Sequence, residues 1–209
     1  MKIVTQSHKI IDAIDGKEIL KKIERIARLC YKSEDKITED SHLGMVKGLL
    51  ARGHEAMLEH VSISVKFITD RGVTHELVRH RLASFAQEST RYVNYGKSDM
   101  EFIEPVFTHC KFDEEVDEVW IETMREAELC YVLMIEAGFP PQDARSVLPN
   151  SVKTEIVVTA NLREWRHILA LRAVGTTGKP HPQIQALMIP LLQELKAKIP
   201  VVFDDLVCG

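Results

Sequence analysis

The order of strand-like and helix-like segments constrains the fold of this chain more than any other feature. Residues 62–69 (SISVKFIT) alternate apolar and polar side chains, and residues 154–160 (TEIVVTA) are rich in β-branched side chains, so both are predicted to be strands. Long helical patterns lie among the strands without the regular strand–helix–strand spacing of a parallel sheet. We therefore predict an α/β (α+β) fold, a single compact domain over residues 1–209 with a small, mostly antiparallel sheet flanked by helices.

The remaining elements are predicted from periodicity and from turn residues. A short strand is expected over residues 2–7, and a short turn or helix over residues 140–149. The longer helices share apolar residues at helical spacing and cover residues 16–32, 42–53, 113–138, 161–175 and 181–199. No functional pattern is recognisable in residues 100–138 or at the C-terminus.

Composition excludes several classes of protein. The chain of 209 residues has a formal net charge of -4, so general affinity for nucleic acid is not expected. It has no apolar run near the roughly 20 residues of a membrane helix and no signal peptide, so no membrane association is expected. The four cysteines lack CxxC spacing. Together these features predict a cytoplasmic protein with reduced thiols.

A basic segment follows the predicted strand over residues 62–69. Asp70 is a suitable N-cap for a helix over residues 71–81. Such a helix would place Glu76, Arg79 and His80 on one face, because residues three and four apart are neighbours.

The next residues, 82–90 (LASFAQEST), are predicted to be a loop with several polar side chains, and Arg91 follows it. Arginine offers a planar fork of donors that suits phosphate and carboxylate oxygens. We interpret residues 79–91 as part of a pocket for a phosphorylated small molecule. A solvated basic helix end is the alternative, which the apolar residues of the loop disfavour.

Spacing argues against a catalytic metal and against the usual nucleotide loops. His54 and His60 lie six residues apart, and His75 and His80 five apart, whereas the zinc-protease pattern needs histidines four apart. No metal site is therefore predicted. Both glycine-rich nucleotide-binding patterns are absent from the sequence, so side chains would have to hold any nucleotide cofactor. No cysteine lies in a basic segment that would activate it as a nucleophile.

A second polar constellation lies in residues 161–172 (NLREWRHILALR), on a predicted helix whose apolar face is supplied by other residues. Its candidates for binding are Asn161, Arg163, His167 and Arg172. For Arg166, a solvated helix face is the alternative interpretation.

Several ordered blocks of this sequence resemble one known family. Arg79-His80-Arg81, then seven residues, then Ser89 matches the signature of flavin-dependent thymidylate synthases. The blocks that are similar to this family cover residues 53–67, 70–92, 140–149 and 154–172.

The resemblance implies an enzyme that methylates dUMP reductively to dTMP. Methylenetetrahydrofolate would donate the carbon, FAD reduced by NADPH would supply the hydride, and tetrahydrofolate would leave. The resemblance also implies a homotetramer whose active sites are shared between subunits. A nucleotide-binding module without catalysis is the alternative class.

Site residues follow from the resemblance by position. Those implied around FAD are His54, Ala56, Arg79, His80, Arg81, Glu88, Asn161, Arg163 and His167. Those implied around dUMP are Glu76, Arg79, Gln87, Glu88, Ser89, Thr90, Arg91, Arg145 and Arg172. Arg172 is the implied catalytic cation, which would stabilise charge on the uracil ring. Ser89 is the other candidate in catalysis, and we expect it to donate a hydrogen bond to dUMP without covalent attack, because no base lies nearby in sequence.

The chain departs from the family pattern at four positions. Glu76 stands where some relatives have glutamine, and Ala56 where many have a small hydroxyl residue. His167 replaces an asparagine of some relatives, and Gln185 stands where arginine is frequent. These departures concern individual contacts to FAD and leave the implied reaction unchanged.

Overall fold

The computed structural model of the chain describes residues 1–97, 99–108, 110–113 and 117–208. They group into two compact units, each assembled from separate stretches of sequence. The first unit comprises Met1–Lys9, Lys66–Arg79 and Phe85–Val157. The second unit comprises Ile10–Val65, His80–Ser84 and Val158–Gly209. A single domain over the whole chain stays a prediction.

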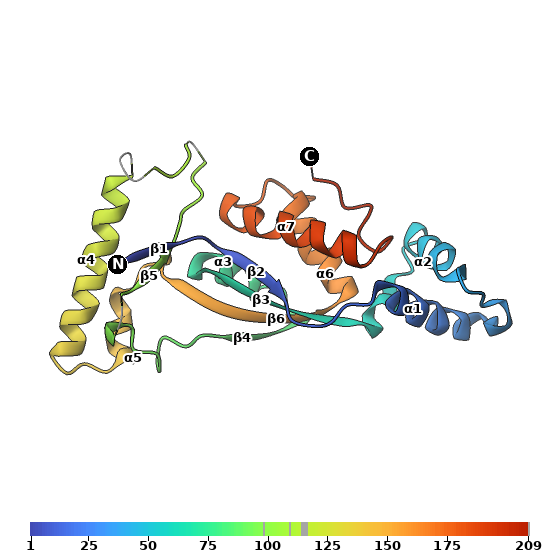
Figure 1. Cartoon of the computed structure of the whole chain (residues 1–209), viewed down its shortest axis with the longest axis horizontal. Helices are drawn as coiled ribbons and strands as arrows, with labels where there is room; N and C mark the ends of the chain where they lie inside the picture. The colour runs from blue at the N-terminus through green and yellow to red at the C-terminus, as the bar shows by residue number, and fades with distance from the viewer. Residues whose placement is uncertain (98, 109, 114–116, 209) are drawn as a thin grey trace. The chain divides into compact units, whose positions relative to one another are not determined.

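A four-stranded sheet is the main β-structure (Figure 1). Its strands follow the order β2 (Ser7–Ile10), β3 (Ser62–Asp70), β6 (Lys153–Asn161) and β4 (Ala83–Gln87). Along β3 and β6 buried side chains alternate with more exposed ones, so one face of each strand contributes to a core. The mixture of helices with a small antiparallel sheet confirms the predicted fold class.

In the first unit, a two-stranded parallel sheet joins β1 (Lys2–Val4) to β5 (Glu101–Ile103). The predicted strand over residues 2–7 is thus divided between β1 and the start of β2. The unit's core is apolar and contains Met100, Phe102, Met124, Tyr131, Ala144 and Val152. Its other elements are α3 (Arg71–Leu77), η3 (Tyr95–Lys97), α4 (Glu118–Glu136), α5 (Pro141–Ala144) and η4 (Arg145–Val147).

In the second unit, the predicted helices are confirmed. They are α1 (Gly16–Tyr31), α2 (Ser41–Ala51), α6 (Leu162–Leu169) with the π-helical η5 (Ala170–Val174) after it, and α7 (Pro182–Lys198). The short η1 (Glu34–Lys36) and η2 (Glu55–His60) were not predicted. Asp15 caps α1, because its side chain accepts a hydrogen bond from the Glu18 N–H. The buried Trp165 anchors α6 to β3 by donating its indole N–H to the Ile63 carbonyl at 2.9 Å.

Two predictions near the basic segment were wrong. Asp70 does cap α3, but the helix ends at Leu77, so Glu76, Arg79 and His80 do not share a helical face. The predicted loop over residues 82–90 contains β4, whose side chains alternate between half-buried and exposed. Small and polar residues at its exposed positions concealed this period of two in the sequence.

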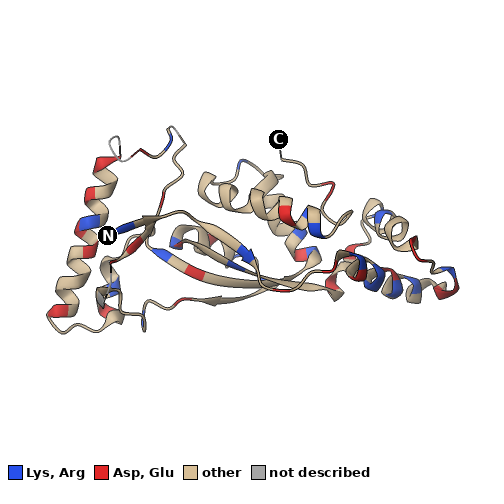
Figure 2. Cartoon of the chain, viewed as in Figure 1, with Lys and Arg blue, Asp and Glu red and all other residues tan. Residues whose placement is uncertain are grey.

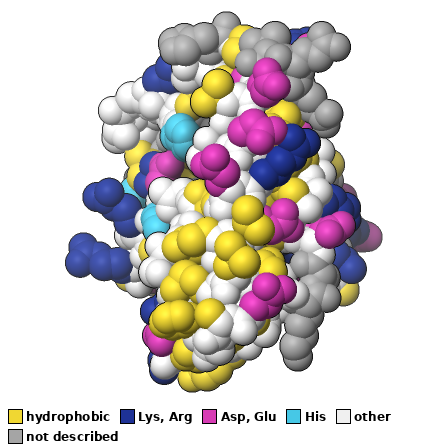
Figure 3. Space-filling view, turned by 90° about the vertical axis from the view of Figure 1, so that its left-hand side faces the viewer, with side chains coloured by type: hydrophobic (Ala, Val, Ile, Leu, Met, Phe, Trp, Pro, Cys, Tyr) yellow, Lys and Arg dark blue, Asp and Glu magenta, His cyan; other side chains and the backbone are white. Residues whose placement is uncertain are grey.

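The predicted helix over residues 113–138 is α4, although residues 114–116 of that prediction lie outside the described part of the chain. Acidic side chains are spread along the helix (Figure 2). The helix also carries exposed apolar residues, and Figure 3 shows apolar side chains gathered on the same side of the molecule. Val119, Leu129 and Leu133 are 83%, 58% and 53% exposed. Among the helices that the structure describes, none is long and apolar enough to cross a membrane.

Candidate functional site

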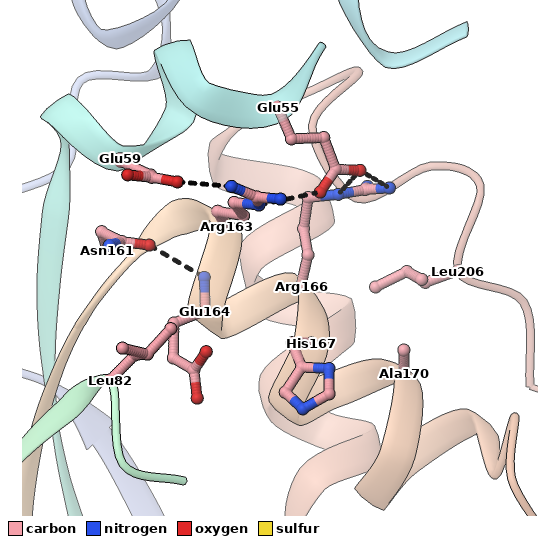
Figure 4. Close-up of a pocket in the computed structure, with 10 residues that line it drawn as sticks. All are labelled: Glu55, Glu59, Leu82, Asn161, Arg163, Glu164, Arg166, His167, Ala170 and Leu206. Atoms are coloured by element: carbon pink, nitrogen blue, oxygen red, sulfur yellow. Dashed lines mark hydrogen bonds and ion pairs between the residues drawn. The ribbon is translucent and has the colours of Figure 1, made fainter. Parts of the chain in front are cut away.

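A pocket of about 670 Å³ lies beside the first turns of α6 in the second unit (Figure 4). Asn161, the last residue of β6, caps this helix by accepting a hydrogen bond from the Glu164 N–H at 2.9 Å. The cap fixes where the chain turns from strand to helix, and polar side chains of the helix then reach the pocket. The lining residues are Glu55, Glu59, Leu82, Asn161, Arg163, Glu164, Arg166, His167, Ala170 and Leu206.

Arg163 is the accessible cation of this pocket, with about half of its side chain exposed. Its Nη1 donates to Glu59 Oε1 at 2.6 Å, and its Nε lies 3.9 Å from Glu55 Oε2. Arg163 also borders a second pocket of about 250 Å³, to which His54 and Ala56 contribute. Three of the residues implied around FAD therefore meet at this smaller pocket.

Arg166 has a supporting position, and its interpretation as a solvated residue was wrong. Its side chain is buried, donates to the Val202 carbonyl, and makes two bonds to the Asp205 carboxylate at 2.6 and 2.7 Å. The guanidinium of Arg166 in turn lowers the pKa of Asp205. The C-terminal segment, which showed no pattern in the sequence, thus fixes one wall of the pocket.

His80 is buried next to the pocket, with 5% of its surface exposed. Its Nε2 accepts a hydrogen bond from Arg172 Nε at 3.3 Å, and its ring meets that of His167 edge to face at 5.7 Å. Burial, then the charge of Arg172, then His167 lower the pKa of His80 to about 4. His80 is therefore neutral at pH 7 and can accept the hydrogen bond from Arg172.

Glu164 completes this buried group. Only 6% of the residue is exposed, and burial raises the pKa of its carboxyl group. Its Oε1 lies 3.7 Å from His80 Nδ1. Because His80 is neutral, this contact joins a carboxyl group to a neutral imidazole and is not an ion pair.

In the first unit, Gln87 and Glu88 lie in a network of polar side chains. Gln87 Nε2 donates to Thr74 Oγ1 at 3.0 Å and to Thr154 Oγ1 at 3.3 Å. The Tyr95 hydroxyl donates to Glu88 Oε1 at 2.6 Å, and burial followed by this hydrogen bond raises the pKa of Tyr95. These bonds fix the chain as it leaves β4.

The residues that follow form a turn in which Ser89 is half-buried, Thr90 is buried and Arg91 is exposed. Ser89 Oγ accepts from the Arg91 N–H at 3.3 Å, and Arg145 Nη1 donates to Thr90 Oγ1 at 3.3 Å. Arg91 is exposed and lies 5.4 Å above the ring of Tyr92. Of the residues implied around dUMP, Arg145 thus contacts Thr90, and Ser89 contacts the Arg91 backbone.

The two units divide the implied site residues between them. Those in the first unit are Glu76, Arg79, Gln87, Glu88, Ser89, Thr90, Arg91 and Arg145. Those in the second unit are His54, Ala56, His80, Arg81, Asn161, Arg163, His167 and Arg172, with Gln185, whose side chain donates to the Ala173 carbonyl at 3.0 Å.

Sequence reasoning missed several polar residues of these clusters. Glu55 and Glu59 lie inside one of the blocks that resemble the family. Their acidic side chains could have been predicted to pair with the basic residues of 161–172, as they do with Arg163. Nothing in the sequence indicated that Glu164 would be buried beside His80 or that the half-buried Tyr95 would bond to Glu88. In the residues with described placement, no group of three potential ligands could hold a metal ion.

Comparison with known proteins identifies the family. The profile described as "Thymidylate synthase complementing protein" matches residues 9–201. A flavin-dependent thymidylate synthase of Geobacter sulfurreducens is 32% identical over 86% of this chain and 78% of its own length. One from Mycobacterium marinum is 35% identical over 91% of this chain and 80% of its own length. The chain belongs to the family of flavin-dependent thymidylate synthases.

A solved structure gives independent support for the fold. A UMP/dUMP methylase from Streptomyces cacaoi, bound with 5-Br dUMP, matches with a TM-score of 0.79 at 20% identity, over 98% of this chain and 96% of the other. At this identity the similarity concerns the fold alone. The family resemblance inferred from the signature at Arg79 to Ser89 is therefore confirmed by whole-chain comparisons.

Proposed function

We propose that this chain catalyses the reductive methylation of dUMP to dTMP. Methylenetetrahydrofolate donates the carbon, NADPH reduces FAD, and tetrahydrofolate is released. The family match over residues 9–201 carries this proposal, since it includes the polar residues of both segments 79–91 and 161–172. The neutral His80 in contact with Arg172 agrees with it, because a half-buried, permanently charged guanidinium can stabilise negative charge on a substrate.

The pocket beside α6 fits FAD by the chemistry of its lining. The accessible Arg163, at present paired with Glu59, could exchange this carboxylate for a phosphate oxygen. Leu82, Ala170 and Leu206 offer apolar surface to a ring system. When bound, FAD supplies the hydride; His54, Ala56, Arg79, His80, Arg81, Glu88, Asn161, Arg163 and His167 are the residues proposed to hold it.

For dUMP, the proposal rests on the turn after β4. Ser89, Thr90, Arg91 and Arg145 would bind the phosphate, because a hydroxyl pair and two guanidinium groups match its oxygens. The remaining residues proposed to contact dUMP are Glu76, Arg79, Gln87, Glu88 and Arg172. We assign to Arg172 the stabilisation of charge on the uracil ring and to Ser89 a hydrogen bond without covalent attack.

The assembly follows from the same family assignment. We propose a homotetramer of single-domain subunits that share active sites and act in the cytoplasm. The exposed apolar side chains of α4, with Leu129 and Leu133 more than half exposed, support burial in a subunit contact. Light scattering on the purified chain tests this, and a fully active monomer would contradict it.

Cofactor binding tests the function. The purified chain, incubated with FAD and washed, is expected to remain yellow and to oxidise NADPH faster when dUMP is present. A chain that binds FAD but whose NADPH oxidation and product formation ignore dUMP would instead be a binding module. A colourless chain would contradict the assignment.

A further inference from the structure

The side chain of Glu164 points in an unusual direction for a glutamate at the third position of a helix. A glutamate there commonly reaches back to the backbone of the N-cap residue. Here the Asn161 side chain caps the helix by accepting a hydrogen bond from the Glu164 N–H. The Glu164 carboxylate, however, extends from the helix toward the pocket (Figure 4) and ends 3.7 Å from His80 Nδ1. Only 6% of the residue is exposed, so this carboxyl group is buried. In Figure 4 no hydrogen bond or ion pair joins it to a basic side chain drawn there.

The contact of Arg172 with the opposite edge of the His80 ring determines which ring nitrogen carries the proton. Arg172 remains protonated and can only donate hydrogen bonds. Because Arg172 Nε donates to His80 Nε2 at 3.3 Å, Nε2 must carry a lone pair. The single proton of the neutral ring then lies on Nδ1, which faces Glu164 Oε1. The opposite tautomer would set an N–H of His80 against the N–H of Arg172 and a lone pair against the carboxylate.

From this geometry we propose that Glu164 is a positioning residue, which selects the Nδ1–H tautomer of His80 and thereby holds Arg172 in its orientation. The role rests on the proposed function, in which the charge of Arg172 acts on the substrate. Glu164 itself does not touch the reacting atoms. Its effect reaches them through one imidazole ring that is fixed between a carboxyl group and a guanidinium.

Other charged groups around His80 do not replace Glu164. His167 lies edge-on to the His80 ring at 5.7 Å, and the charge of His167 lowers the pKa of Glu164, opposing the effect of burial. Arg163 and Arg166, from the same helix, are paired with Glu59 and Asp205. Glu164 is thus the acidic group in contact with Nδ1.

The wild-type protein gives the first test. In the full chain labelled with ¹⁵N-histidine and loaded with FAD, the nitrogen shifts of His80 are expected to show a protonated Nδ1 and an unprotonated Nε2 at pH 7. Assignment uses His80→Gln. A protonated Nε2 would overturn the proposal. This measurement requires neither activity nor a stable Glu164 variant, so its result is independent of whether the chain makes dTMP.

Kinetics give the second test. Glu164→Leu removes the acceptor and, at saturating FAD, is expected to lower kcat about tenfold or more, with KM for dUMP within about twofold. Glu164→Gln keeps an acceptor oxygen and is expected to restore kcat to within about threefold of wild type. As a matched pair, Glu39→Leu and Glu39→Gln alter an exposed glutamate outside both the pocket lining and α4, and should match wild type. Wild-type kcat in Glu164→Leu would overturn the proposal, whereas absence of dTMP from the wild type would refute the proposed function instead.

Discussion

His80 should make the stability of this protein depend on pH between 6.5 and 4. The ring is almost wholly buried, and burial with the charges of Arg172 and His167 lowers its pKa from 6.5 to about 4. The folded chain therefore binds this proton less readily than the unfolded chain. The resulting stabilisation is complete above pH 6.5 and is lost as the pH falls toward 4.

The magnitude follows from linkage. A pKa of 6.5 in the unfolded chain and about 4 in the folded chain corresponds to about 3 kcal/mol in total. About 2 kcal/mol of this should be lost already at pH 5. The raised pKa of Glu164 has the opposite sign, because the folded state then binds its proton more readily. A comparison between variants is therefore needed to isolate His80.

Urea unfolding at constant protein concentration, from pH 7 to pH 5, measures the effect in wild type and in His80→Gln. Glutamine cannot gain a proton, so between these pH values wild type should lose about 2 kcal/mol more unfolding free energy than the variant. His60→Gln, at an exposed histidine, is the matched control and should follow wild type. Equal losses in wild type and His80→Gln would refute the assignment of a neutral, buried His80.

Four further substitutions test the site. Asp205→Asn weakens the buried Arg166 pair and should lower the unfolding free energy by about 1–3 kcal/mol, measured by urea midpoint; an unchanged midpoint would contradict the supporting role. Arg91→Lys keeps the charge but loses the planar fork of donors, so KM for dUMP should rise. Arg172→Lys should also lower kcat, and unchanged turnover in Arg172→Lys would remove Arg172 from catalysis. Ser89→Ala should weaken dUMP binding about ten- to a hundredfold yet still form dTMP at high dUMP; no product at any dUMP concentration would make Ser89 a nucleophile.

The sequence predicted the helices and the long strands well because burial dictates their periodicity. In β3 the alternation of Ile63, Val65 and Phe67 with polar residues corresponds directly to buried and more exposed positions. β4 was missed because its exposed positions carry Ser84 and Ala86, and its half-buried face lacks a continuous apolar pattern. Pairing with other strands, which no local pattern encodes, holds it in the sheet.

The site was predicted as residue types but not as a set of contacts. Motif spacing indicated Arg163 and His167, yet only the structure shows that Arg166, three residues away from Arg163, is buried against Asp205. The role of Glu164 depends on His80, which is 84 residues away in the sequence. Such long-range polar pairs have no periodicity from which they could be inferred.

Formation of dTMP by the purified chain is the most direct measurement of the central claim. The complete reaction contains dUMP, methylenetetrahydrofolate, NADPH and FAD, and dTMP is detected by mass after separation. We expect dTMP in the complete reaction and none when dUMP, the folate or FAD is omitted. Absence of dTMP from the complete reaction, with a folded chain that has bound FAD and dUMP, would contradict the account.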